Sequence, residues 1–293
     1  MTSYMWFWYV ILSALASGVS VILNKKALNK INPALVSWSL FVFSIPLLVY
    51  PALKDGIPKV NGIFWIASIA SVLVYGFGKT LSLKSLKSNL MSEIIPLSLF
   101  GVLIQYILGL ILFSEKLNAI SIFGLLLIVV GGYFLKIEEA KEDFFRPFKL
   151  LFTDWGARMY LIAFSLMVLA SAIDKVSLNH MINVNQSFYL LLTNVLTSIL
   201  IGVYIQKDDR NWVHDLKNNF WILFFGGIMF YLVSIFYLYG ITEGPLALVS
   251  GVKKLEVFFV LIFGWLLFKD KPKKGVWIGG LIMLLGVVLI KIG

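Results

Sequence analysis

The sequence predicts an all-α integral membrane protein of ten transmembrane helices, arranged as an inverted repeat of five plus five. Three observations support this fold class: an apolar composition, charge-free runs that recur along the chain, and a second half that repeats the residue spacing of the first. Of the 293 residues, 60% are hydrophobic and only 14% are charged, whereas about a quarter of the residues of a soluble domain are charged. A water-soluble fold could not cover that much apolar surface, so lipid is the expected solvent.

The predicted spans are runs of apolar residues. A transmembrane helix needs about 20 such residues to cross a hydrocarbon core about 30 Å thick. Seven charge-free runs meet this requirement: residues 1–24, 31–53, 60–78, 94–114, 117–135, 181–206 and 218–242. Three further runs are shorter or carry charges: residues 159–173, 244–268 and 275–290. The first run has no basic segment before it, so we expect it to be retained as a span and not removed as a signal peptide.

An internal duplication relates the two halves of the chain. We predict a first five-helix unit at residues 1–137, a connecting loop at 138–156 and a second unit at 157–293. One offset of 155 positions relates eight pairs of residues near the ends of the units: Gly109, Phe113, Glu115, Lys116, Gly124, Gly131, Lys136 and Ile137 correspond to Gly264, Phe268, Asp270, Lys271, Gly279, Gly286, Lys291 and Ile292. Because five is odd, the second unit begins on the opposite side of the bilayer, and the units are inverted.

This arrangement favours a transport function. Inverted repeats are typical of secondary transporters, whose polar sites lie near the bilayer midplane at the repeat interface. Helix glycines such as Gly124 and Gly131 are expected to permit close packing of helices. A structural membrane protein or scaffold that merely arose by duplication is the alternative.

The basic residues favour one side of the predicted membrane. Loops after the odd-numbered spans hold 18 lysines and arginines, Lys25 and Lys79 among them, and the other side holds five. By the positive-inside rule the first side is cytoplasmic, which predicts that both termini lie outside. The formal charge of +10 is explained by anionic lipid headgroups. The expected partners are therefore a lipid bilayer and a small-molecule substrate, with no nucleic acid.

Residue types that support catalysis or metal binding are scarce. The chain has no cysteine, and its two histidines, His180 and His214, lie far apart in the sequence. We therefore expect no metal site and no cofactor. A membrane enzyme acting on lipid-linked substrates would need a clustered nucleophile or metal site, and the sequence has neither, so the protein is not predicted to be an enzyme.

The sharpest local signal is a group of three charges, Lys253, Lys254 and Glu256, in the middle of the run 244–268. Each ionised residue near the centre of a span costs about 2.5 to 3.5 kcal/mol, so each needs a partner, a water-filled cavity or a function. Lys253 and Glu256 are three apart and can pair on one helical face. Lys254 points about 100° away and, if it faces a cavity, would bind an anion.

A structural role for the two lysines is the alternative, with Glu93 and Asp174 as neutralising carboxylates on neighbouring helices. Before the lysines, Gly244, Pro245 and Gly251 would loosen or break the helix. Such interruptions are tolerated where backbone lines a cavity.

Other polar residues within or near spans are further candidates. Asp174 and Lys175 follow only about fifteen apolar residues, so they are expected within the depth of the membrane. Asp174 is, with Glu93, a candidate for ion coupling. Glu93, at the start of span four, is either a proton carrier or an ordinary charge at a helix N-terminus. Lys25 occupies the matching place in the first unit and can also be read as a helix-end residue.

Two tyrosines recur at matching places in the units, Tyr75 in the first and Tyr231 in the second. They are either substrate contacts or donors of interhelical hydrogen bonds.

Each unit ends in a similar pattern, "LILFSEKL" with "IFGLLLIVVGGYFL" in the first and "GWLLFKDKP" with "WIGGLIMLLGVVLI" in the second. This pattern resembles the drug/metabolite transporter superfamily, in particular proteins with two EamA-type domains. The resemblance covers nearly the whole chain, and the acidic residues Glu115 and Asp270 before the last helix of each unit are part of it. It implies a transporter of the cell membrane whose termini are both cytoplasmic, in conflict with the lysine count, so the orientation stays open.

The segment "VKKLEVFFVLIFGWLLF" also resembles the penultimate helix of triose-phosphate and nucleotide-sugar transporters, where a basic pair engages a phosphate. Here the pair is Lys253 and Lys254. Because the second residue is lysine and not arginine, bidentate phosphate recognition is not available. The resemblance implies a small polar substrate that is anionic, phosphorylated or zwitterionic, with coupling to protons or to a counter-substrate. An exporter of amino acids or drug-like compounds is the alternative, and a receptor without transport is a further one.

Overall fold

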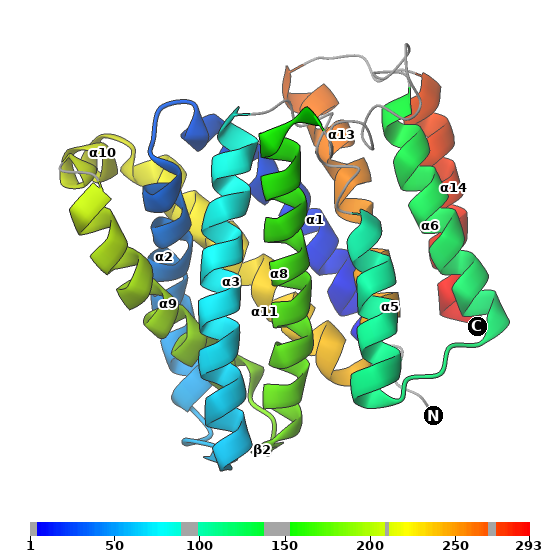
Figure 1. Ribbon diagram of the computed structural model, residues 1–293, viewed down its shortest axis with the longest axis horizontal. Helices are drawn as coiled ribbons and strands as arrows, with labels where there is room; N and C mark the ends of the chain where they lie inside the picture. The colour runs from blue at the N-terminus through cyan, green and yellow to red at the C-terminus, as the bar shows by residue number, and fades with distance from the viewer. Residues whose placement is uncertain (1–4, 89–98, 138–152, 209–210, 269–273) are drawn as a thin grey trace.

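The fold is a bundle of long helices with one short strand pair (Figure 1). A computed structural model describes residues 5–88, 99–137, 153–208, 211–268 and 274–293. The elements are α1 (Met5–Leu28), α2 (Pro33–Leu53), β1 (Lys59–Val60), α3 (Gly62–Ser88), α5 (Phe100–Phe113), α6 (Ala119–Ile137), α8 (Trp155–Asn179), β2 (Met181–Ile182), α9 (Gln186–Asp208), α10 (Trp212–Asn218), α11 (Phe220–Glu243), α12 (Leu246–Lys253), α13 (Leu255–Phe268) and α14 (Lys274–Ile292). Strands β1 and β2 pair antiparallel and join the turn after α2 to the turn after α8.

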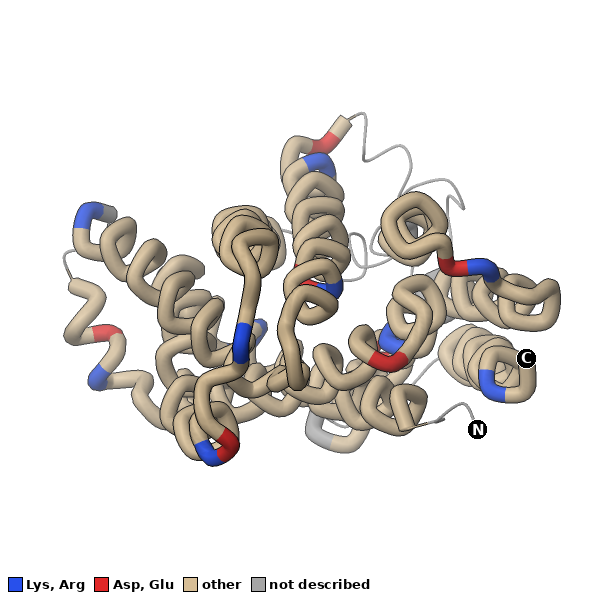
Figure 2. Tube along the Cα trace, turned by 90° about the horizontal axis from the view of Figure 1, so that it is seen from below, with Lys and Arg blue, Asp and Glu red and all other residues tan. Residues whose placement is uncertain are grey.

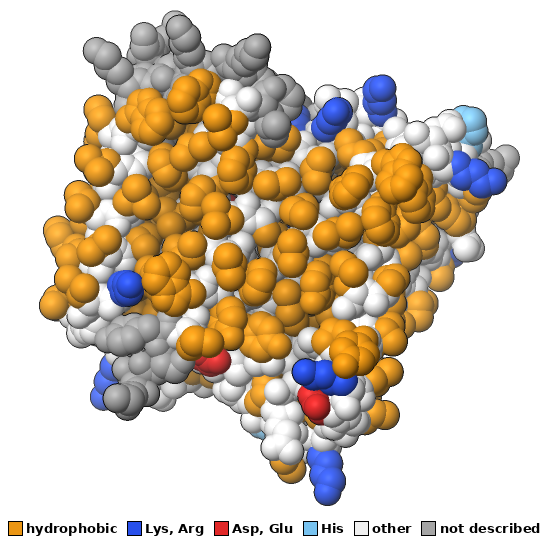
Figure 3. Space-filling model, turned by 180° about the vertical axis from the view of Figure 1, so that it is seen from behind, with side chains coloured by type: hydrophobic (Ala, Val, Ile, Leu, Met, Phe, Trp, Pro, Cys, Tyr) orange, Lys and Arg blue, Asp and Glu red, His pale blue; other side chains and the backbone are white. Residues whose placement is uncertain are grey.

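Seven of the described helices are long and apolar enough to cross a membrane: α1, α2, α3, α8, α9, α11 and α14. Helices α5 and α6 are shorter apolar helices. The outer face of the bundle is covered by hydrophobic side chains, and most charged side chains gather toward its two ends (Figure 3). An apolar band between two polar ends is the surface that a bilayer requires of a protein that spans it.

Helix starts follow from local capping chemistry. Asn32 precedes α2, and its side-chain oxygen accepts a hydrogen bond from the Ala34 N–H at 2.9 Å, while Pro33 occupies the first helical position. Asp154 precedes α8 and accepts from the Ala157 N–H at 2.7 Å. Both residues satisfy a backbone donor that the first helical turn leaves without a partner.

The third helix differs from its predicted span. The charge-free run ends at Gly78, but α3 continues to Ser88, so Lys79 lies inside a helix and not in a loop. Thr80 hydrogen-bonds the Gly76 carbonyl of the preceding turn at 3.0 Å, and Ser82 and Ser85 are buried. These polar side chains interrupt the apolar sequence after Gly78, but the helix continues because they are buried or hydrogen-bonded within it. The fourth predicted span is described only as α5, and Glu93 lies outside the described residues.

Helices of the two predicted units pack against one another in a reciprocal pattern. Helix α1 packs against α11 and α8 against α3, so the first helix of each unit contacts the third helix of the other. Helix α2 packs against α9, and α6 packs against α14. A two-fold relation between two similar units produces this kind of exchange.

The ends of the chain lie together. The Lys291 ammonium near the end of α14 lies 4.7 Å from the centre of the Trp8 ring near the start of α1. Figure 2 shows the two termini beside each other at one edge of the molecule. The start of α1 and the end of α14 therefore lie at the same end of the bundle.

The predicted close packing at glycines is confirmed where α6 meets α14. A Cβ atom at Gly124 would lie 2.7 Å from the Gly286 carbonyl oxygen, and one at Gly131 would lie 2.7 Å from the Gly279 carbonyl oxygen. These glycines are the duplicated ones, so the same residues serve both units. Backbone contacts this close tolerate no side chain.

We expect Gly124→Val to lower the free energy of unfolding by about 1–3 kcal/mol or more, because the added atoms force α6 away from the α14 backbone. Thermal unfolding of the purified protein in detergent measures this loss. Gly264→Val is the matched control, because nothing lies within 4 Å of a Cβ at Gly264. Equal melting temperatures for the two variants would contradict the close packing of α6 and α14.

Candidate functional site

A cavity of about 230 Å³ lies between helices of both units. This volume is well above the space that a single water molecule needs, so the cavity has room for a small solute. Its charged lining residues are Lys79, Asp174, Lys253, Lys254 and Glu256. Its aromatic lining residues are Phe41, Tyr75, Phe164, Tyr189, Phe230 and Tyr237.

The predicted ninth span is interrupted where its charges lie. Helix α12 ends at Lys253 and α13 begins at Leu255, so Lys254 separates two short helices. Lys253 lies in the last turn of α12, and Glu256 lies in the first turn of α13. Helix dipoles favour a positive charge at the C-terminus and a negative charge at the N-terminus, so both positions are favourable. The predicted interruption is therefore found, and it consists of two breaks. Gly244 and Pro245 separate α11 from α12, and Lys254, three residues after Gly251, separates α12 from α13.

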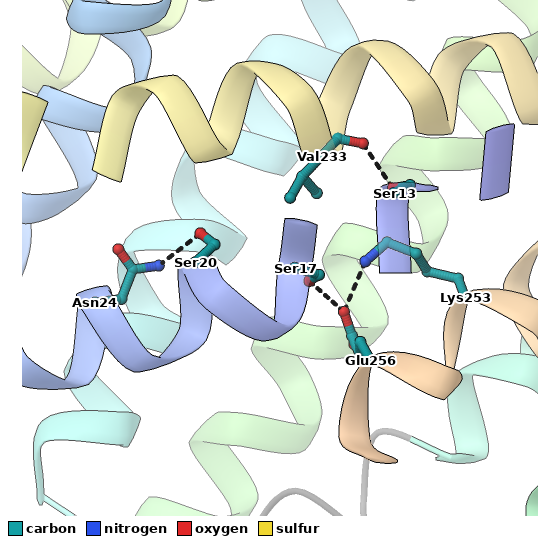
Figure 4. Close-up of polar contacts among 7 residues, drawn as sticks. All are labelled: Ser13, Ser17, Ser20, Asn24, Val233, Lys253 and Glu256. Atoms are coloured by element: carbon teal, nitrogen blue, oxygen red, sulfur yellow. Dashed lines mark hydrogen bonds and ion pairs between the residues drawn. The ribbon is translucent and has the colours of Figure 1, made fainter. Parts of the chain in front are cut away.

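The predicted pairing of Lys253 with Glu256 is confirmed. The Lys253 Nζ lies 2.7 Å from Glu256 Oε2, and both side chains are largely buried. The Ser17 hydroxyl, from α1, donates to the same carboxylate oxygen (Figure 4). Nearby, the Ser13 hydroxyl of α1 donates to the Val233 carbonyl of α11 at 2.7 Å. The charge of Lys253 is thus compensated within its own span, and α1 holds the pair in place.

Lys254 has a different environment. It is 3% exposed, and its Nζ lies 4.1 Å from the centre of the Phe164 ring on α8. Among the described residues it has no carboxylate partner. A ring face attracts a desolvated cation by about 2 kcal/mol, which is less than the cost of removing an ammonium group from water. Lys254 therefore lines the cavity as a cation that an anion would stabilise.

Lys79 is a third cavity lysine, and the sequence did not predict it as a site residue. Its Nζ lies 5.7 Å from the centre of the Phe230 ring, and the described part of the chain offers it no ion pair. The apolar run that ends at Gly78 suggested a loop at this position. The signal that could have found it is spacing, because Lys79 lies four residues after Tyr75 and shares its helical face.

Asp174 also lines the cavity, and it is not the partner of Lys254. The Tyr189 hydroxyl donates to Asp174 Oδ1 at 2.6 Å, and the Ser71 hydroxyl donates to the same oxygen. This carboxylate is held by hydroxyl groups from α3 and α9 instead of by a cation.

Gln105, from α5, contributes an amide to the cavity wall. Its Nε2 donates to the Ser171 hydroxyl oxygen and to the Tyr237 hydroxyl oxygen, the latter at 3.2 Å. Its Oε1 is buried and has no hydrogen-bond partner in the described structure. A buried acceptor without a partner is costly, and in a binding cavity it indicates a ligand that donates.

Lys175, predicted as an intramembrane charge, lies away from the cavity lining. Its Nζ contacts Glu115 Oε1 at 2.6 Å and the Gly244 carbonyl oxygen at 2.7 Å. Glu115 Oε2 accepts from the Leu246 N–H at 2.8 Å. These four residues form a buried clamp that joins the end of α5 to α8 and to the junction of α11 and α12. Both Glu115 and Lys175 are used here to hold helices together.

Two further predicted site residues also lie elsewhere. Lys25 donates from Nζ to the Leu86 carbonyl oxygen at 2.7 Å, near the last turn of α3. Tyr231 is partly buried against the apolar core and is not among the cavity-lining residues of the described structure. Of the two matching tyrosines, only Tyr75 lines the cavity.

Comparisons with known proteins agree with this architecture. The sequence profile of the EamA-like transporter family matches residues 4–137 and 154–292. One solved crystal structure matches with a TM-score of 0.70 and 13% sequence identity, over 96% of this chain and 94% of that chain. At this identity the likeness shows the fold alone. No curated protein matches the sequence.

We expect Lys175→Met to destabilise the protein by about 3–5 kcal/mol, because it leaves the Glu115 carboxylate buried without a cation. Thermal unfolding in detergent measures the change. Adding Glu115→Gln to Lys175→Met should restore part of the loss. Lys54→Met is the control, because the Lys54 to Asp55 pair is exposed and 3.9 Å apart, where a pair contributes at most about 1 kcal/mol. A Lys175→Met variant as stable as the control would show that the clamp contributes nothing.

Proposed function

Because this chain belongs to the EamA-like transporter family, we propose that it is a secondary transporter that moves a small polar, anionic metabolite by alternating access. One observation carries the choice of an anion. Lys254 is a buried cation in the middle of an interrupted span, it lines a cavity between the two units, and no described carboxylate neutralises it. An ionisable residue within the membrane is costly, and a passing anion would compensate it.

The shape of the site supports a small substrate. The cavity of about 230 Å³ has room for a small metabolite, and Lys79 supplies a further ammonium group on the wall that Lys254 lines. Lysines act as point charges and do not impose the planar, two-pronged geometry that arginine does. The site is therefore suited to either a phosphate or a carboxylate group. In this proposal Glu256 neutralises and orients Lys253, and Tyr75 contributes to the wall.

The ten-helix, inverted five-plus-five architecture is part of the same proposal. Its support is the reciprocal packing of α1 with α11 and of α3 with α8, together with the glycine contacts that join α6 to α14. Alternating access would then consist of one unit rocking against the other around the cavity between them. We place the protein in the cell membrane.

An exporter of amino acids or drug-like compounds is the second candidate. Six aromatic residues line the cavity, and aromatic rings favour a substrate with an apolar body. A receptor or scaffold without transport would show no substrate-dependent flux in liposomes.

A ligand screen followed by a flux assay tests the proposal. The purified protein is screened by thermal shift against inorganic phosphate, phosphoenolpyruvate, glycerol 3-phosphate and the L-amino acids. The probe that stabilises the protein most is then used, radiolabelled, for uptake into proteoliposomes. Stabilisation by phosphorylated probes favours the first candidate, and stabilisation by aromatic amino acids favours the second.

We expect Lys254→Met to reduce this uptake about 10- to 100-fold, because a hydrogen bond to a charged group contributes about 1.5–3 kcal/mol. The amount of folded protein in the membrane should stay unchanged. Lys207→Met, at an exposed position near the end of α9, is the matched control and should transport normally. Unchanged uptake by Lys254→Met would refute the assignment of Lys254 as the anion ligand.

A further inference from the structure

The charged groups of the cavity lie at two separate ends. On α8, Phe164 contacts the Lys254 ammonium, and Asp174 follows ten residues later, which is about 15 Å along the helix axis. On α3, Ser71 contacts Asp174, and Lys79 follows eight residues later, about 12 Å further on. The cavity therefore has a basic end at Lys79 and Lys254 and an acidic end at Asp174.

The packing of α3 against α8 supports this separation. A Cβ atom at Gly78, next to Lys79, would lie 3.0 Å from the Ala163 carbonyl oxygen and 3.2 Å from the Met167 side chain. Lys79 on α3 and Phe164 on α8 are therefore at the same level. Lys79 on α3 and the Lys254 contact on α8 therefore lie together. The contact of Ser71 with Asp174 lies two to three helical turns away from them.

The acidic end holds two oxygen atoms without partners. The Ser71 and Tyr189 hydroxyls both contact Asp174 Oδ1, and no contact within the described ranges reaches Oδ2. Gln105 is 2% exposed, and its Oε1 has no partner. The Gln105 amide is held by Ser171, which lies three residues before Asp174 and is therefore its neighbour on the α8 surface. Two acceptors with free lone pairs thus share one end of the cavity.

The other titratable groups do not neutralise this end. The titratable groups of the lining come from α3, α9, α11 and the junction of α12 with α13: Tyr75, Lys79, Tyr189, Tyr237, Lys253, Lys254 and Glu256. The nearest of them to Asp174 is a tyrosine hydroxyl, Tyr189. Lys175, the next residue on α8, is paired with Glu115. A carboxylate in the membrane interior that lacks a cation is costly.

An α-amino acid cannot place its two charged groups at opposite ends of the cavity. The ammonium and carboxylate groups of an α-amino acid are attached to the same carbon atom, and the anionic group of a small metabolite is engaged at Lys254 in the function proposed above. A positively charged ligand at the acidic end would compensate the charge of the Asp174 carboxylate.

We propose that the Asp174 and Gln105 end of the cavity is a separate site for a small inorganic cation, a sodium ion or a proton, that couples transport. The inference rests on the proposed function. Carboxylate and amide oxygens are the ligands that hard cations prefer, and a proton would bind Asp174 Oδ2. A cation at this end neutralises Asp174 without displacing the anion from the basic end.

The test measures cation binding directly, by thermal unfolding of the purified full-length protein in detergent. In one arm sodium replaces N-methyl-D-glucamine at constant ionic strength and pH 8. In the other arm the pH falls from 8 to 5.5 without sodium. A cation that binds the folded state raises its stability by mass action, and a carboxyl that binds a proton more tightly when folded gains stability as the pH falls.

We expect the melting temperature of the wild type to rise by about 3 °C in one of the two arms and the rise to be lost in Asp174→Asn. A rise with sodium identifies a sodium site, and a rise with falling pH identifies a proton site. Gln105→Met, which removes the free amide oxygen, should weaken a sodium response and leave a proton response intact. Asp55→Asn, at an exposed position, should behave as the wild type in both arms.

Two results would overturn the inference. One is a response to sodium and to pH that is the same in the wild type, Asp174→Asn and Gln105→Met. The other is stabilisation by 6-aminohexanoate that requires both Asp174 and Lys254, which would make the two ends one site for an elongated zwitterion. The anion response at Lys254 is measured in the same preparations. Loss of the anion response alone counts against the proposed function, and loss of the cation response alone counts against the second site.

Discussion

The structure depends on how charges within an apolar bundle are compensated. Two lysines inside the bundle have carboxylate partners: Lys253 pairs with Glu256 at 2.7 Å, and Lys175 pairs with Glu115 at 2.6 Å. Lys254 lies over the face of the Phe164 ring and has no carboxylate partner among the described residues. Because ion pairs in a low-dielectric interior are strong only when their geometry and hydrogen bonds are complete, the first two lysines fix helices in place. Lys254 instead lines the cavity.

The break in the ninth predicted span helps to stabilise the buried charges of Lys253 and Glu256. Ending α12 at Lys253 and starting α13 at Leu255 places a positive side chain at a helix C-terminus and a negative one at a helix N-terminus. Each charge is then stabilised by the dipole of its own helix as well as by the other charge. The break thereby stabilises the Lys253 and Glu256 pair and leaves Lys254 between the two helices, against the cavity.

The two units meet through contacts of two different kinds. The glycine contacts of α6 with α14 are tight and apolar, whereas the centre of the bundle is hollow and lined by hydroxyl, amide, aromatic and charged groups. The clamp of Glu115 and Lys175 joins α5 to the junction of α11 and α12. Close helix packing at the periphery and a polar cavity at the centre fit a membrane transporter of the EamA-like family.

The sequence by itself determined the membrane class, the family and most of the long helices, because apolar runs of about 20 residues need no tertiary information to be recognised. It also determined the pairing of Lys253 with Glu256, since residues three apart on a helix meet wherever the helix lies. Only the tertiary structure decided that Lys79 and Gln105 face the cavity and that Tyr231 does not. The partners of Asp174 and Lys175 lie on helices far away in the sequence. Such contacts depend on how helices pack side by side, which the periodicity of any single helix does not specify.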